Sequence, residues 1–209
     1  MAAHFTLTDG EIHTLREQGW FLRDGVLGHL AAMRVHDAIE ALAASRQLRP
    51  AGLSHGAAHR VDPSVRGDSI AWIEPGETRP GLDPLMAVFV ALRDTLNREA
   101  YLGLDRIEVQ IARYPGGGTR YDRHQDALST PPGSPNRRVT AIYYANPAWR
   151  PGHGGLLRLH VASNPQDIAP VLDRLLVFLS ERVEHEVLPA EVPRRAVTAW
   201  LRARDHLGR

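Results

Sequence analysis

The sequence predicts an α+β domain in which N-terminal helices support a double-stranded β-helix, or jelly roll. Apolar residues recur at helical spacing in the first half of the chain. They alternate with polar residues from Ile107 onward and are then interrupted by Gly- and Pro-rich turns. Helices that precede a run of strands are typical of an α+β domain whose helices pack on one face of a β core. We expect one domain, 1–209, with helical support in 1–104 and the jelly-roll core in 105–209.

Helices are expected at 8–19, at 27–45 and from Asp83 onward, with a short strand at 20–22. Thr8 and Glu11 have the spacing of a capping box, and Gly19 is a typical helix terminator. In 27–45, apolar residues recur three and four positions apart. Asp83 followed by Pro84 is a typical start for the third helix.

The segment 49–80 connects the second and third helices and is rich in proline and glycine. This composition predicts an irregular arm. The arm is long for a passive connection, and long loops in compact domains often act as lids. We therefore interpret 49–80 as a lid loop over a site.

The second half of the chain reads as a series of short strands. Ile107, Val109 and Ile111 alternate with less apolar neighbours, which indicates a half-buried strand. Further strands are expected at 121–126, 138–145, 156–161, 174–180, 185–188 and 195–202. Seven or so strands with turns between them favour a barrel or a double-sheet jelly roll.

Composition excludes several kinds of chemistry. All 25 basic residues are arginine and cysteine is absent, so lysine Schiff bases, lysine-dependent phosphate loops, thiolate nucleophiles and thiolate metal sites are excluded. A formal net charge of +1 argues against nucleic-acid binding. No apolar run approaches the roughly 20 residues of a membrane span, and no secretory leader is visible. We expect no membrane partner and a cytoplasmic location.

His124 and Asp126 are the first candidates for a metal site. They stand two residues apart in the expected strand 121–126, so alternation predicts side chains that point the same way. A histidine and a carboxylate are two of the three protein ligands that bind non-haem Fe(II). His185, in a later strand, is the candidate third ligand. Taken singly, His185 could be a core histidine and Asp126 a turn residue.

Arg194 stands nine residues beyond His185 and begins a strand. Alternation places Arg194, Thr198 and Trp200 on one face, beside the proposed metal. A dicarboxylate that chelates iron at one end suits a bidentate arginine at the other.

Other interpretations of Arg194 stay open at this point. It could pair with Glu184 or Glu191 at the surface, which would leave Arg195 as the anchor. Alternation favours Arg194, because choosing Arg195 would turn Thr198 and Trp200 outward.

The stretch from Arg113 to Trp200 resembles the catalytic core of the 2-oxoglutarate-dependent, Fe(II) prolyl hydroxylases. The branch is that of the hypoxia-inducible factor prolyl hydroxylases and their bacterial relatives. The similar segments are 114–119, Tyr121, 123–126, 137–146, Trp149, 154–158, 173–176 and 185–187 before Arg194. Upstream, 66–74 is similar to the strand that follows the substrate-covering loop in that branch.

The resemblance implies a role for each matching residue. It implies that iron is bound by His124, Asp126 and His185. It implies that 2-oxoglutarate is bound by Arg194, Tyr144, Tyr114, Leu157 and Thr198, with Tyr144 rather than its neighbour Tyr143 facing the pocket. It implies that the substrate is contacted by Tyr121, Arg137, Trp200, Arg66 and Asp68.

The activity that the resemblance implies is hydroxylation of a prolyl residue in a protein, with release of succinate and CO2. Fe(II) is the implied cofactor, 2-oxoglutarate and O2 are the cosubstrates, and ascorbate is a candidate reductant. Bacterial relatives act on a proline in elongation factor Tu, which makes this factor the first substrate to test. The alternatives are a hydroxylase of a free amino acid or other small metabolite with the same iron site, and a non-catalytic jelly-roll binding or sensor module.

The segment before Arg66 departs most from the family pattern. Since that region is expected to cover the substrate, the departure leaves the substrate's identity open. His55 and His59 have a spacing that would share a helical face and could bind zinc, but nearby prolines and glycines disfavour a helix.

Overall fold

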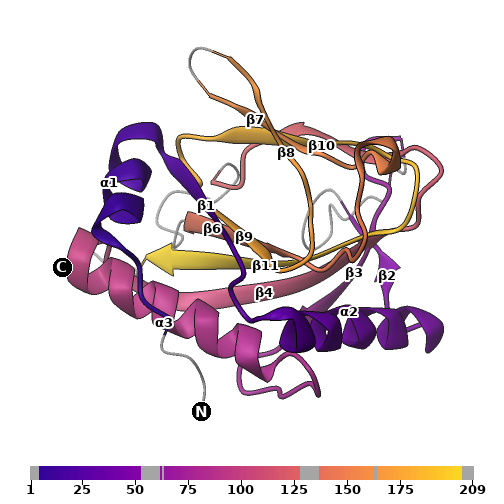
Figure 1. Ribbon diagram of the computed structural model, residues 1–209, viewed down its shortest axis with the longest axis horizontal. Helices are drawn as coiled ribbons and strands as arrows, with labels where there is room; N and C mark the ends of the chain where they lie inside the picture. Colours follow the sequence, from indigo (N-terminus) through magenta and orange to yellow (C-terminus); the bar gives the residue numbers. More distant parts are fainter. Residues whose placement is uncertain (1–4, 53–61, 63, 128–136, 162–163, 204–209) are drawn as a thin grey trace.

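Two β-sheets face each other, and helices pack along the outer side of the larger sheet (Figure 1). The computed structural model describes residues 5–52, 62, 64–127, 137–161 and 164–203. Its helices are α1 (Asp9–Gln18), α2 (His29–Ala44), α3 (Asp83–Ala100) and a 3-10 turn (Pro151–His153). The α+β jelly-roll prediction is confirmed.

Within the described residues, the larger sheet contains seven strands and the smaller sheet four. The larger sheet has the order β1 (Trp20–Asp24), β9 (Arg174–Leu179), β6 (Arg137–Tyr144), β11 (Arg194–Ala203), β4 (Leu104–Tyr114), β3 (Ser69–Ile73) and β2 (Arg49–Pro50). The smaller sheet has the order β5 (Thr119–His124), β10 (Glu184–Ala190), β7 (Leu157–His160) and β8 (Gln166–Ile168). Neighbouring strands are antiparallel, and β11 lies between β6 and β4.

The predicted helix ends are present. Thr8 accepts a hydrogen bond from the backbone N–H of Glu11 at 3.2 Å, and the Glu11 carboxylate accepts one from the N–H of Thr8 at 2.8 Å. Gly19 ends α1 in the left-handed conformation, and α3 begins at Asp83 with proline in its first turn. Local capping therefore fixes both ends of α1. The N-cap residue of α3 is Leu82, not Asp83, and it makes no side-chain capping hydrogen bond.

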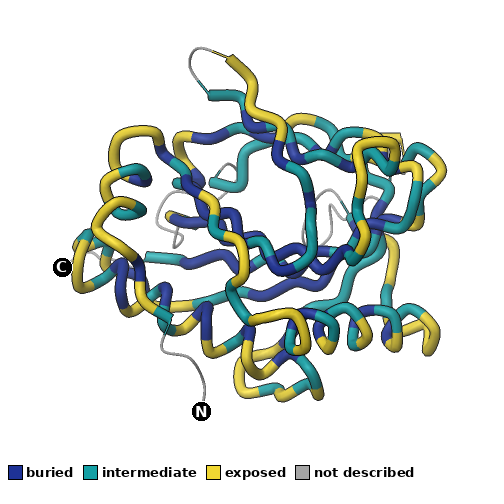
Figure 2. Tube along the Cα trace, viewed as in Figure 1, coloured by how far each residue is buried: buried dark blue, intermediate teal, exposed yellow. Residues whose placement is uncertain are grey.

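The larger sheet is buried on both faces, as the dark central strands of Figure 2 show. One face packs against the helices, through β6 residues such as Val139 and Tyr143. The other face packs against the smaller sheet, through Ile142 and Tyr144 of the same strand. Successive residues of one strand therefore belong to two separate hydrophobic cores.

The prediction of an irregular arm over 49–80 is wrong in part. The segment contains β2 and β3, and β3 pairs along its whole length with β4, in agreement with the family resemblance for 66–74. Its residues are partly covered on both faces, so no two-residue period marks the strand. The lid role stays a prediction. His55 and His59, and thus the possible zinc site, lie outside the described residues.

One further strand prediction is wrong at its end, and one short strand was not predicted. The strand expected at 121–126 ends at His124, so Asp126 lies in a turn after β5. The three-residue strand β8 was not predicted, because it is too short to show a period.

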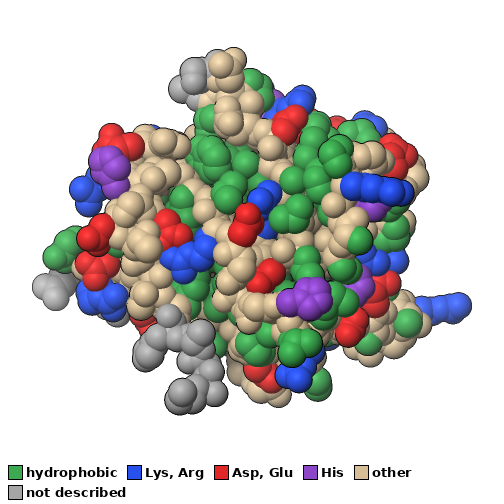
Figure 3. Space-filling model, in the orientation of Figure 1, with side chains coloured by type: hydrophobic (Ala, Val, Ile, Leu, Met, Phe, Trp, Pro, Cys, Tyr) green, Lys and Arg blue, Asp and Glu red, His purple; other side chains and the backbone are tan. Residues whose placement is uncertain are grey.

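The surface agrees with the composition. Figure 3 shows acidic and basic side chains interspersed over the visible face. In the part of the chain that the structure describes, no helix has the length and apolar character needed to cross a membrane.

Candidate active site

A cavity of about 870 Å³ lies between the two sheets. Its lining includes residues of β5 and β10 from the smaller sheet and of β3, β4, β6 and β11 from the larger one. The predicted site residues that line it are Arg66, Asp68, Tyr114, Tyr121, His124, Asp126, Arg137, Leu157, His185, Arg194, Thr198 and Trp200. Side chains from strands distant in the sequence thus share one space.

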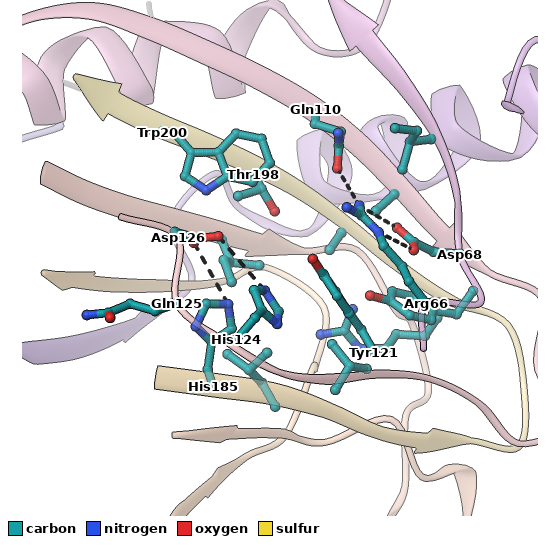
Figure 4. Close-up of a pocket in the computed structure, with 18 of the residues that line it drawn as sticks. Arg66, Asp68, Gln110, Tyr121, His124, Gln125, Asp126, His185, Thr198 and Trp200 are labelled. Carbon is teal, nitrogen blue, oxygen red and sulfur yellow. Dashed lines mark hydrogen bonds and ion pairs between the residues drawn. The ribbon is translucent and has the colours of Figure 1, made fainter. Parts of the chain in front are cut away.

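His124, Asp126 and His185 converge at one end of this cavity (Figure 4). His124 and His185 are directly opposite each other on the paired strands β5 and β10. Asp126 Oδ1 lies 3.9 Å from His124 Nε2, and Asp126 Oδ2 lies 3.8 Å from His185 Nε2. The potential ligand atoms lie within 4.8 Å of one another, which allows one metal ion to bind all three.

Neighbouring groups orient the imidazole of His124. Its Nδ1 lies 2.8 Å from the carbonyl oxygen of Asp122, and the ring of Tyr121 stacks on it with centroids 3.8 Å apart. A carbonyl oxygen only accepts, so Nδ1 carries the hydrogen and Nε2 presents its lone pair to the cavity.

The sequence predicts that strand alternation points Asp126 toward the site, and this explanation is wrong. It lies in the turn after β5, and Thr140 of β6 donates a hydrogen bond from Oγ1 to Asp126 Oδ2 at 2.8 Å. The turn interpretation and the ligand interpretation of Asp126 are therefore compatible.

The protonation states suit a divalent cation. Burial lowers the pKa of both His124 and His185. Burial opposes the ionisation of Asp126, but the neighbouring imidazoles and Arg137 outweigh it, so the pKa of Asp126 lies below its usual value. Near neutral pH, the site consists of two neutral imidazoles and one carboxylate, which are the forms that bind metal.

Arg194 projects into the cavity, and Arg195 does not. Arg194 is buried, and its Nε donates a hydrogen bond to the carbonyl oxygen of Gly155 at 2.8 Å. Arg195 pairs instead with Glu40 of α2, at 2.5 Å, on the helix-covered face of the sheet. Of the two arginines that the sequence left open, Arg194 is the one beside the metal ligands.

The charge of Arg194 has no carboxylate partner at ion-pair distance within the described residues. Tyr114 and Tyr144 flank it, with ring centroids 5.1 and 5.2 Å from the guanidinium carbon. The Tyr144 hydroxyl is buried and lacks a hydrogen-bond partner in the described part of the chain. Burial raises its pKa to about 12, so it stays protonated, although Arg194 acts in the opposite direction. A buried cation and a free buried donor side by side form a site for an anion.

Tyr143 and Tyr144 point to opposite faces of the larger sheet. Tyr143 packs in the helical core and donates a hydrogen bond to Asp173 at 2.9 Å. Leu157 packs beside Tyr144 in the core between the sheets.

Arg66 and Asp68 form one wall of the cavity, at the right of Figure 4. Arg66 binds both carboxylate oxygens of Asp68, at 2.7 and 3.0 Å, and also donates to the amide oxygen of Gln110 at 2.9 Å. The guanidinium lies 4.6 Å from the ring centroid of Tyr121. Burial opposes the charge of Arg66, but Asp68 outweighs it and the pKa of Arg66 is raised.

Two tryptophans also line the cavity. The rings of Trp72 and Trp200 have centroids 5.6 Å apart, and the guanidinium of Arg137 lies 3.8 Å above the Trp200 ring. Arg137 also pairs with Glu108 at 3.2 Å. The two indoles offer flat aromatic surface, and Trp200 is stacked with a cation.

Sequence reasoning missed several residues of this site, among them Trp72, Gln110, Thr140 and Gly155. Gln110 occupies the more polar face of an alternating strand. The alternation predicts a half-buried strand whose polar face is exposed to solvent, but that face borders the cavity. Trp72 belongs to the segment interpreted as a loop, although the family resemblance included it. Nothing in the sequence marks Thr140 or Gly155 as contacts of a metal ligand or of Arg194.

Comparison with known proteins agrees with this geometry. The sequence profile of the 2OG-Fe(II) oxygenase superfamily matches residues 109–202. Human prolyl hydroxylase EGLN3 is 33% identical over 196 residues, covering 89% of this chain and 79% of that protein. Rat Egl nine homolog 1 is 34% identical over 197 residues, covering 89% of this chain and 56% of that protein. The chain spans about half the length of the Egl nine homolog 1 proteins it matches.

Solved structures of prolyl hydroxylases are also similar to this chain. A prolyl-4-hydroxylase from Pseudomonas putida has 34% identity and a TM-score of 0.83, over 92% of this chain and 97% of that one. A prolyl hydroxylase from Trichoplax adhaerens, solved with a hypoxia-inducible factor oxygen degradation domain peptide, has 30% identity and a TM-score of 0.79, over 92% and 87%. Fe(II) and 2-oxoglutarate are the cofactor and cosubstrate of this family, and His124, Asp126 and His185 supply its His-Asp-His donor set. The chain therefore belongs to the 2OG-Fe(II) oxygenase superfamily, in the group of the Egl nine-type prolyl hydroxylases.

Proposed function

We propose that this protein hydroxylates a prolyl residue in a protein or peptide. The observation that carries the proposal is the shared cavity of the His-Asp-His set and the buried, unpaired Arg194. The similarity to prolyl hydroxylases over nearly the whole chain supports the choice of substrate class. When bound, Fe(II) and 2-oxoglutarate supply an oxidation in which O2 is consumed, succinate and CO2 are released and a C–H bond becomes C–OH.

The residues of this chain bind and orient the reactants. His124, Asp126 and His185 would hold the iron. The Arg194 guanidinium and the Tyr144 hydroxyl would hold the far carboxylate of 2-oxoglutarate, which gives the buried charge a partner. Tyr114, Leu157 and Thr198 would line the same pocket, with Leu157 helping to exclude water.

The prolyl substrate would lie in the part of the cavity lined by Trp200, Tyr121 and Arg66. An uncharged, puckered prolyl ring packs well on a flat aromatic ring, and Trp200 and Tyr121 offer such rings in the same cavity as the metal ligands. The side chain of Asp68 is fully covered, so its role would be to hold Arg66 in place. Arg137, stacked on Trp200, would set the position of that indole.

Metal and cosubstrate binding can be tested without a substrate. Under anaerobic conditions, Fe(II) and 2-oxoglutarate should give a weak visible charge-transfer band, and His124→Ala should abolish it. A wild-type protein that gives neither the band nor succinate on exposure to air would contradict the proposal.

The substrate requires a second experiment. Elongation factor Tu and a library of proline-containing peptides should be incubated with the loaded enzyme, with ascorbate as reductant, and analysed by mass spectrometry. The expected result is a gain of one oxygen atom on a proline. Succinate formation that is stimulated only by a free amino acid or another small metabolite would favour the small-molecule alternative.

A further inference from the structure

Asp126 lies in a turn beyond the end of β5, and a residue of another strand contacts its carboxylate. β5 ends at His124, so the pleat of the strand does not orient Asp126. The Asp126 side chain is nevertheless only 7% exposed. Thr140, in the middle of β6, donates a hydrogen bond from Oγ1 to Asp126 Oδ2 at 2.8 Å. A residue of the larger sheet thus holds a potential metal ligand that belongs to a turn.

Thr140 is itself held by a second hydroxyl. Ser180 follows β9, and its Oγ lies 2.8 Å from Thr140 Oγ1. Both residues are fully buried, and the backbone N–H of Ser180 donates to the carbonyl oxygen of Arg138 at 3.0 Å, which ties Ser180 to β6. We propose that Ser180 and Thr140 form a directed hydrogen-bond chain that fixes the metal-binding carboxylate of Asp126.

The direction of the chain follows from the donors available. An ionised carboxylate has no hydrogen, so the single hydrogen of the Thr140 hydroxyl goes to Asp126. Thr140 must then accept in its contact with Ser180, and Ser180 must donate. If the Thr140 hydrogen turned toward Ser180, Asp126 would lose the hydrogen bond from Thr140. Ser180 therefore keeps Thr140 in the orientation that serves Asp126.

The chain restrains the carboxylate without cancelling its charge. Asp126 Oδ2, which accepts from Thr140, lies 3.8 Å from His185 Nε2, while Oδ1 lies 3.9 Å from His124 Nε2. A neutral hydroxyl leaves the negative charge available for a cation, whereas a guanidinium at the same place would compete for it. Thr140 and Ser180 are positioning residues that act through Asp126.

This inference rests on the metal site of the proposed function and is independent of the substrate. It is tested by the affinity for Mn(II), a stand-in for Fe(II) that is stable in air, measured by titration calorimetry without 2-oxoglutarate. Thr140→Val, which keeps the shape and removes the hydroxyl, should weaken Mn(II) binding about 10- to 100-fold. Thr140→Ser should restore binding, and Ser180→Ala should give a smaller loss than Thr140→Val.

The double variant distinguishes a chain from two separate effects. Once Thr140→Val has removed the middle hydroxyl, adding Ser180→Ala should cause no further loss of Mn(II) affinity. A double variant whose loss equals the product of the two single losses would overturn the chain. So would a folded Thr140→Val protein that binds Mn(II) as tightly as wild type.

Thr95→Val is the matched control, because Thr95 is also a buried threonine but lies in α3, on the other side of the larger sheet. It should leave Mn(II) affinity unchanged. If Thr140→Val does not fold, Ser180→Ala decides, and wild-type affinity in that variant would overturn the proposal. Since Mn(II) binding needs no prolyl substrate, a failure to hydroxylate proline leaves this test intact.

Discussion

The contacts of Arg194 suit the carboxylate-binding role proposed for it. Its Nε already donates to the carbonyl oxygen of Gly155, and the rings of Tyr114 and Tyr144 lie 5.1 and 5.2 Å from the guanidinium carbon. The two Nη groups are left as a fork, the geometry that matches a carboxylate bidentately. Lysine would provide charge at this position but neither the fork nor the bond to Gly155.

Arg194→Lys should therefore raise the KM for 2-oxoglutarate about 30-fold, equivalent to about 2 kcal/mol of lost binding. The measurement is succinate production as a function of 2-oxoglutarate concentration. Arg195→Lys is the control, because Arg195 faces Glu40 and should leave this KM unchanged. An equal rise in both variants would contradict the assignment of Arg194 as the anchor.

At the scale of elements, the turn that precedes β7 makes room for Arg194. Gly155 has a φ of 69°, and a Cβ at this position would lie 2.9 Å from Cδ of Arg194. Only glycine combines this backbone conformation with so close an approach. The turn thus both supplies the carbonyl that orients the arginine and leaves space for its stem.

Gly155→Ala should displace the Arg194 side chain and raise the KM for 2-oxoglutarate about 10-fold, with destabilisation of about 1–2 kcal/mol from the left-handed backbone. Gly152→Ala tests the same change in the same turn region, where nothing lies within 4 Å of the added Cβ. It should leave KM and stability near wild type. Kinetics and urea unfolding of the two variants provide the comparison, and indistinguishable results would refute the crowding argument.

Glu40 of α2 links the helical layer to the larger sheet. It pairs with Arg113 of β4 at 2.8 Å and with Arg195 of β11 at 2.5 Å. Burial opposes its ionisation, but the hydrogen bonds from the two arginines outweigh burial and lower the pKa of Glu40 to about 2. The folded state therefore binds this proton more weakly than the unfolded state does.

The stability that Glu40 contributes should be fully present above its ordinary pKa of 4.5 and be lost as pH falls from there toward 2. About a third of the side chain is exposed, so screening by solvent limits the contribution to about 1 kcal/mol. Urea unfolding of wild type and Glu40→Gln should differ at pH 7 and converge at acid pH. A difference that persists unchanged at pH 3 would rule out the ion pairs as its cause.

At the scale of the whole molecule, the metal site joins the two sheets. His124 and His185 belong to the smaller sheet, whereas Thr140 in the larger sheet holds Asp126. An ion bound by all three would cross-link β5, β10 and, through Asp126, β6. Binding energy at the site therefore adds to the stability of the packed sheets.

Mn(II) at 100 times its Kd should raise the free energy of unfolding by about 2.7 kcal/mol, and a chelator should reverse the effect. The measurement is thermal unfolding with and without the ion. Asp126→Ala should abolish the increase, and Asp122→Ala, which keeps the backbone carbonyl that orients His124, should retain it. A stabilisation that survives in Asp126→Ala would place the ion elsewhere.

Sequence patterns could predict the parts of this molecule that depend on local rules. The capping box at Thr8, the proline after Asp83 and the two-residue period from Ile107 mark elements that the structure contains. Strand β3 has no such mark, since both of its faces are partly covered and its pairing partner, β4, comes much later in the chain. Long-range pairing of this kind leaves little trace in local periodicity.

Some residues of the candidate site could likewise be predicted from local patterns, and others could not. His124, His185 and Arg194 follow from residue type and spacing, and alternation correctly separates Arg194 from Arg195. The reasoning for Asp126 was wrong although the residue lies at the site, because a turn and a contact from Thr140 replace the expected strand. Contacts with residues remote in sequence cannot be read from spacing.

The burial of both faces of the larger sheet also limits how this chain can change in length. Inserting one residue into β11 before Thr198 would move every following side chain to the opposite face, so that Ala199 and Leu201 of the helical core would exchange places with Thr198 and Trp200 of the cavity wall. Such an insertion would damage the helical core and the cavity together. Viable insertions and deletions are thus confined to the turns, and β6 and β11 can vary only by substitution.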